Sequence, residues 1–123
     1  ARPEMLELVD SCADFLKIFC VDHERQKLFG EKQGYTVTKD LITRLLVLSE
    51  EDPSNHTCLA TISNLTNFVA QMSFQYDNHS FLLATLWPQF IQSQLNEGKG
   101  SSDLLQIVVN LLRFGGRRRK ELS

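Results

Sequence analysis

The residues of this chain that could bind a metal or act as a nucleophile are its three histidines and three cysteines. His23, His56 and His79 are far apart, and no pair of cysteines or histidines has the short spacing typical of a zinc site. The sequence also contains no Ser–His–Asp pattern, no paired carboxylate motif and no glycine-rich phosphate loop. It therefore predicts no metal, no cofactor and no catalytic residue, and it indicates that the protein is not an enzyme.

The cysteines bear on the compartment. Because there are three of them, Cys12, Cys20 and Cys58 cannot all pair within the chain. Cys12 and Cys20 are eight residues apart in a predicted helix, and two helical turns are too long for a disulfide to bridge. We expect all three to be reduced and buried as small apolar residues. Reduced cysteines favour a cytoplasmic or nuclear protein.

Three triplets that begin at Asn55, Asn64 and Asn78 match the acceptor pattern for N-glycosylation. They support an alternative class, a secreted four-helix-bundle ligand of the cytokine type. Two features argue against it: Asn64 falls in the middle of a predicted helix, and the number of cysteines is odd.

Composition limits the remaining choices. A chain of 123 residues with 42% hydrophobic residues has room for one globular domain. A net charge of −2 gives no overall field that would attract nucleic acid. The apolar runs are much shorter than the roughly 20 residues that cross a membrane, so we expect no membrane span.

An apolar pattern with helical spacing recurs every 46 residues along the chain. A fixed period of roughly 40–47 residues is typical of an α-solenoid, in which stacked neighbours bury one continuous core. The positions that match across three copies are Cys12, Cys58 and Leu104; Leu16, Ile62 and Val108; and Phe19, Leu65 and Leu111. We expect the last six of these to be buried. Neither end of the chain resembles a polar cap.

Helical periodicity accounts for nearly the whole chain, and no run alternates well enough to predict a strand. Thr38, Ser54 or Asn55, and Ser102 or Asp103 are the expected caps of the third, fourth and last helices. The expected helices cover residues 3–20, 24–30, 38–49, 55–72, 80–86, 88–95 and 103–114. The predicted fold class is therefore all-α.

Two stretches resemble a known pattern. Residues 15–29 resemble the end of the third helix of an armadillo repeat, its acidic turn and the short first helix of the next repeat. Residues 62–66 are similar to the core of an armadillo third helix, where a small residue and an asparagine precede a leucine. The resemblance covers most of residues 5–114. There are departures: armadillo repeats are usually shorter than 46 residues, Gly34 has no counterpart before Trp87, and Ile18 takes the asparagine position in the first copy.

This resemblance implies an armadillo-like α-solenoid fragment of about two helix-triplet repeats plus a leading third helix. The helical domain would span residues 1–114, and residues 115–123 would form a basic flexible tail. In armadillo proteins the third helices line a groove in which asparagines hold the extended backbone of a partner. The partner-binding residues implied here are Asn64 and Asn110, with Asn67 and Arg113 on the same helices.

The expected function is that of a non-catalytic protein–protein interaction module, part of a scaffold or regulatory protein, that binds a partner peptide or helix on its third helices. Self-association through an uncapped helical end, near Met5 and Leu8 or near Leu112, is the alternative of the same class. Residues 117–120 form a run of four cations that suits a nuclear import signal, a nucleic-acid contact or a plain solvated tail.

Overall fold

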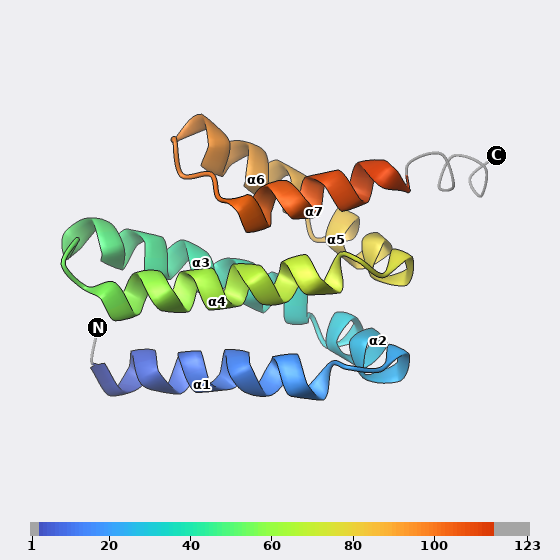
Figure 1. Ribbon diagram of the computed structural model, residues 1–123, viewed down its shortest axis with the longest axis horizontal. Coiled ribbons are helices and arrows are strands. Elements are labelled where there is room, and N and C mark those ends of the chain that lie inside the picture. Colours follow the sequence, from blue (N-terminus) through green and yellow to red (C-terminus); the bar gives the residue numbers. More distant parts are fainter. Residues whose placement is uncertain (1–2, 115–123) are drawn as a thin grey trace.

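The computed structural model describes residues 3–114, and every regular element among them is helical. No strand forms within this range, which confirms the predicted all-α class. Figure 1 shows α-helices joined by short turns, with one 3₁₀ turn between the fourth and fifth. In chain order the elements are α1 (Pro3–Phe19), α2 (His23–Glu31), α3 (Gly34–Glu51), α4 (His56–Met72), η1 (Tyr76–Asn78), α5 (His79–Ala84), α6 (Trp87–Asn96) and α7 (Ser102–Arg113).

Three helices start next to a side chain that accepts a hydrogen bond from their first turn. Asp22, Asn55 and Ser101 precede α2, α4 and α7, and each accepts from the backbone N–H three residues further on, at 2.9, 3.1 and 3.3 Å. Such caps satisfy backbone donors that have no partner inside the helix. Asn55 is one of the two caps predicted for α4, whereas the cap of α7 is Ser101 and neither Ser102 nor Asp103.

Helices α3 and α6 are each preceded by a residue other than glycine whose backbone is in the left-handed conformation. Gln33 has a φ of 63° and Leu86 a φ of 61°. A left-handed backbone costs an ordinary residue about 1–2 kcal/mol, so the packing of the flanking helices must hold these turns in place. The prediction that Thr38 caps α3 is wrong: α3 begins at Gly34, and the Thr38 hydroxyl donates to the Gly34 carbonyl at 2.7 Å inside the helix.

The helices that carry the three copies of the 46-residue pattern form one layer. Helices α1, α4 and α7 run in the same direction, and α4 packs between α1 and α7 (Figure 1). Helix α3 packs on α4 and runs antiparallel to it, since only a short turn joins the two. Because α1 and α7 lie on opposite sides of α4, the chain is not arranged as a bundle in which Leu16 would pack directly on Ile107.

Residues one period apart also contact each other between α3 and the α5–α6 segment. The rings of Tyr35 and Phe81, 46 positions apart, stack with their centroids 6.1 Å from each other. The Lys39 ammonium donates to the backbone carbonyl of Thr85, again its equivalent, at 2.5 Å. At these two places, residues one sequence period apart contact each other directly.

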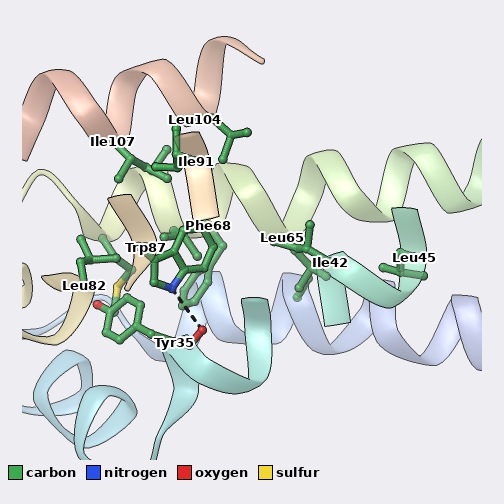
Figure 2. Packing of buried hydrophobic residues seen from close by; sticks show 14 of the residues in the cluster. Tyr35, Ile42, Leu45, Leu65, Phe68, Leu82, Trp87, Ile91, Leu104 and Ile107 are labelled. Carbon is green, nitrogen blue, oxygen red and sulfur yellow. Dashed lines mark hydrogen bonds between the residues drawn. The ribbon is translucent and has the colours of Figure 1, made fainter. Parts of the chain in front are cut away.

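The core lies between α3, α4 and α6 and is rich in aromatic side chains (Figure 2). Trp87, Tyr35 and Phe68 are almost completely buried. The Trp87 ring N–H donates to the Tyr35 carbonyl at 3.2 Å, so the indole satisfies its donor while filling the core. The Phe29 ring meets the rings of Tyr35 and Phe68 edge-on, with centroids 5.0 and 5.1 Å away.

The predicted core residues divide into two groups. Leu65 and Leu111 are buried, as expected. Leu16, Phe19, Ile62 and Val108 are only partly buried, although they pack against the core. All three cysteines are free: Cys20 and Cys58 are buried, but Cys12 is exposed, so the prediction of a buried Cys12 is wrong.

Within residues 3–114, no helix is long and apolar enough to span a bilayer. The basic segment 115–123, including the cations at 117–120, lies outside the described residues.

Candidate partner-binding site

The asparagine predicted as the main partner contact, Asn64, is engaged inside the molecule. Its side-chain amide donates to the carboxylates of Asp10 at 3.0 Å and Asp14 at 2.9 Å, both on α1. Its carbonyl oxygen accepts from the Lys17 ammonium, also on α1. Asn64 is half-buried. It therefore connects α4 to α1, and any partner that used its amide would have to displace these contacts.

The other predicted contacts are also divided among different environments. Asn67 is half-buried and donates to the Asp103 carboxylate on α7 at 3.3 Å. Asn110 is fully buried: its amide donates to the Ser73 hydroxyl at 2.8 Å, and its oxygen accepts from Gln106. Arg113 is exposed at the end of α7. The structure therefore does not bring the three asparagines to one open surface, and the buried Asn110 side chain is not accessible to a partner.

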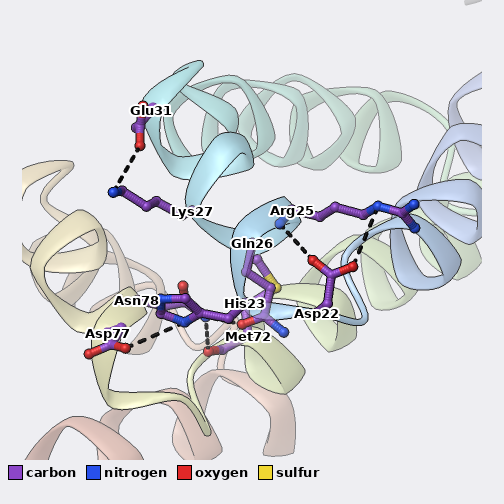
Figure 3. A network of polar contacts seen from close by, with 9 residues as sticks. All are labelled: Asp22, His23, Arg25, Gln26, Lys27, Glu31, Met72, Asp77 and Asn78. Carbon is purple, nitrogen blue, oxygen red and sulfur yellow. Dashed lines mark hydrogen bonds and ion pairs between the residues drawn. The ribbon is translucent and has the colours of Figure 1, made fainter.

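All three glycosylation triplets begin at an asparagine whose side chain makes a hydrogen bond within the fold. Asn78 is buried and donates to the Met72 carbonyl at 2.8 Å and to the Gln26 amide oxygen at 2.9 Å (Figure 3). Asn64 is held by α1 as described above. Asn55 is the cap of α4. The polar atoms of these asparagines serve the fold.

The histidines do not converge on a common site. The His23 ring faces the Asp77 carboxylate at 3.4 Å on the surface (Figure 3), while His79 is buried with its Nε2 atom 2.7 Å from the Ser73 carbonyl. In the described part of the chain, no group of three or more histidines, cysteines or acidic residues is placed to hold a metal ion.

A large apolar groove lies between α1 and α3, which we call the α1–α3 groove. It encloses about 520 Å³, within the range of ligand-binding clefts. Thr38 and Lys32 are among the few polar residues on its wall. The apolar lining includes Leu8, Cys12, Leu16 and Phe19 of α1, Leu28 and Phe29 of α2, Val37 and Leu41 of α3, and Leu65 of α4.

Next to this groove, α1 exposes apolar side chains to solvent, whereas the residues one and two periods later, on α4 and α7, are mostly buried. Phe15 is 60% exposed, whereas its equivalents Thr61 and Ile107 are 0% exposed. Ile18 is 72% exposed, and its equivalent in α7 is the buried Asn110. We call Leu8, Cys12, Phe15 and Ile18 the open face of α1. Exposed aromatic and aliphatic side chains grouped beside an apolar groove are typical of a protein contact.

The opposite end of the stack also exposes apolar side chains. Leu112 of α7 is 74% exposed, while its equivalents Cys20 and Thr66 are 6% and 4% exposed. Leu59 and Leu105, one period apart on α4 and α7, are also exposed. Leu105, Val109 and Leu112 are exposed at steps of four and three residues on one face of α7, and none of them lines the α1–α3 groove.

The environment of the thiols differs between the groove and the core. Burial raises the pKa of Cys20 and of Cys58, and nearby carboxylates add to the effect. Both therefore stay protonated at neutral pH and have little nucleophilic character. Cys12 stands apart from them because it is exposed in the groove.

The sequence predicted Leu8 of this face as part of an end for self-association, but it did not predict that Cys12, Phe15 and Ile18 are exposed beside it. Ile18 stands where both later copies have an asparagine, and Phe15 stands where the second copy has Thr61 and the third has Ile107. Comparisons with protein-family models, with curated proteins and with solved structures found no match.

Proposed function

We propose that this chain is a non-catalytic protein–protein interaction module with an armadillo-like α-solenoid arrangement. The arrangement is supported by the parallel stack of α1, α4 and α7 and by the contacts between residues one period apart. In this proposal α1 is a leading third helix, α2–α4 form one triplet and η1–α7 form the next. Residues 1–114 would form the domain.

The observation that carries the proposal is the open face of α1 beside the α1–α3 groove. Burying a large apolar side chain such as Phe15 or Ile18 contributes roughly 1.5–3 kcal/mol. Phe15 and Ile18 are both exposed on α1, which forms one wall of the apolar groove of about 520 Å³, so a partner that covers them would gain this free energy. We propose that a partner peptide or helix binds there.

The surface formed by the other two third helices, α4 and α7, is the second candidate. Leu59 and Leu105 are exposed on it at matching positions, and Arg113 is exposed nearby in sequence. Asn64 and Asn67 border it only as half-buried side chains that already have partners. We therefore favour the open face of α1 over the asparagines predicted from the resemblance.

Charge placed on each surface separates the two candidates. Phe15→Glu and Leu105→Glu introduce the same carboxylate at apolar side chains of almost equal exposure, 60% and 59%. Proteins captured from a cell extract should be lost with Phe15→Glu and retained with Leu105→Glu, while both variants keep the wild-type melting temperature. The reverse pattern would place the function on the surface of α4 and α7. Partners that remain bound to both variants would contradict the proposal.

Self-association remains a proposal because Leu112 leaves the other end of the stack open as well. Light scattering on the isolated chain tests it: a mass that rises with concentration, and that returns to the monomer value with Leu112→Glu, would support it. A cytoplasmic or nuclear location is proposed on the basis of the free cysteines, of which Cys20 and Cys58 are buried.

A further inference from the structure

We propose that the α1–α3 groove takes an amphipathic helix of a partner protein, which lies antiparallel on α1 in the position that α3 takes on α4. The inference rests on the proposed interaction function and names the class of partner. The chain itself supplies the template. The space between α1 and α3 has an equivalent one period later, between α4 and α6, and α3 fills that space.

Two residues that line the groove have equivalents in that second slot. Cys12 of α1 corresponds to Cys58 of α4, and Leu41 of α3 corresponds to Trp87 of α6. Both equivalents are held by α3: the Cys58 thiol lies 3.1 Å from the Leu45 carbonyl, which accepts from it, and the Trp87 ring N–H donates to the Tyr35 carbonyl at 3.2 Å. Both are also 0% exposed. The space between α4 and α6 is thus filled by α3, and the α1–α3 groove is the equivalent space one period earlier.

The next copy repeats the relation. Leu104 of α7 is the equivalent of Cys12 and Cys58, and Ile91 of α6 is the equivalent of Leu45. Figure 2 shows Ile91 next to Leu104 and Ile107, all of them buried. A helix that continues this interface onto α1 would therefore place a large apolar residue on Cys12.

The groove also sets the length and pattern of the helix. On α1 it extends from Leu8 to Phe19, which is about 16 Å or three turns of helix. The template face on α3 consists of Tyr35, Thr38, Ile42 and Leu45, all buried, at steps of three and four residues. This is the spacing by which amphipathic helices insert into apolar grooves.

A second copy of this chain is a poorer source of such a helix. Its α3 and α6 carry the required apolar faces, but these are already buried in its own core. Its exposed apolar residues at the far end, such as Leu105 and Leu112, belong to a third helix, which in this fold packs parallel to other third helices.

A synthetic peptide with the sequence of residues 34–51 is the probe, and the Cys12 thiol is the reporter. The peptide contains no cysteine, and in the native chain Cys12 is the exposed thiol while Cys20 and Cys58 are buried. The rate at which a maleimide modifies Cys12 should fall at least tenfold when the peptide saturates the groove. A peptide with Ile42→Asp and Leu45→Asp should give no protection, because it places charge on the binding face.

A matched control peptide carries the same two charges on the outer face, as Thr43→Asp and Val47→Asp, both exposed in α3. It should protect Cys12 as well as the parent peptide does. Protection by none of the peptides, or equal protection by all three, would overturn the inference. Protection that grows with protein concentration without any peptide would also overturn it, in favour of a second copy.

The inference and the proposed function can fail separately. If Phe15→Glu removes captured partners but the parent peptide does not protect Cys12, the interaction function stands and the helical partner does not. If the peptide protects Cys12 but no partner depends on Phe15, the groove accepts a helix without serving the proposed function.

Discussion

The contacts of Asn64 predict that its replacement weakens the fold. Asn64→Ala removes two hydrogen bonds to the Asp10 and Asp14 carboxylates and one from the Lys17 ammonium. Hydrogen bonds to charged groups contribute roughly 1.5–3 kcal/mol each when shielded, but Asn64 is only half-buried and Asp14 is exposed, so water replaces part of what is lost. We expect the free energy of unfolding to fall by about 2 kcal/mol.

Urea unfolding followed by circular dichroism measures this change. For a domain of this size, 2 kcal/mol corresponds to a fall in melting temperature of roughly 8 °C. Ser63→Ala, on the exposed side of the same helix, is the matched control and should stay within about 0.5 kcal/mol of the wild type. In a double-mutant cycle of Asn64→Ala with Asp14→Ala, the coupling energy should exceed about 0.5 kcal/mol.

Two results would contradict the bridging role of Asn64. A coupling energy near zero would show that Asn64 does not bridge α4 to α1 in solution. An Asn64→Ala variant as stable as Ser63→Ala, but unable to capture partners, would restore the role in partner binding that the armadillo resemblance implies.

Three further predictions concern the core and the thiols. Ile107→Ala should lower the free energy of unfolding in urea by about 2–5 kcal/mol, because Ile107 is 0% exposed, and the partly buried Ile62 should cost less; equal costs would contradict the assigned burial. Burial raises the pKa of Tyr35 above its ordinary value of 10.0, so its contribution to stability is complete below pH 10 and is lost as the pH rises further, when the unfolded chain releases the proton. Tyr35→Phe should therefore flatten the alkaline loss of melting temperature, at little cost near pH 7 because the buried hydroxyl has no hydrogen-bond partner; an unchanged alkaline profile would exclude Tyr35 as its source. A thiol reagent should modify Cys12 in the native chain and reach Cys20 and Cys58 only after denaturation, and mass spectrometry of the labelled peptides would expose any other order.

The helices themselves could be predicted because they depend on local signals. Apolar spacing of three and four residues located all of them, and the cap at Asn55 marked the start of α4. The left-handed turns at Gln33 and Leu86 could not be predicted, because neither residue favours that conformation and tertiary packing enforces it.

The site was less predictable because its determinants are distant in sequence. The partners of Asn64 are 50 and 54 residues away on α1, so its pattern suggested a free side chain. Cys12 has the same place in the period as Cys58, and the pattern therefore indicated burial. The helix that covers Cys58 has no counterpart over Cys12 among residues 3–114, and sequence periodicity does not contain that information.

The position at which a docked helix contacts Cys12 tests most directly whether α1 receives a helix as α4 receives α3. Two versions of the 34–51 peptide are compared under mild oxidation, one with Leu45→Cys and one with Thr43→Cys. We predict a mixed disulfide between Cys12 and the cysteine at position 45, because Leu45 contacts the equivalent Cys58, and little cross-linking at the outward-facing position 43. Equal cross-linking at both positions, or preference for position 43, would contradict the claim that α1 receives a helix as α4 receives α3.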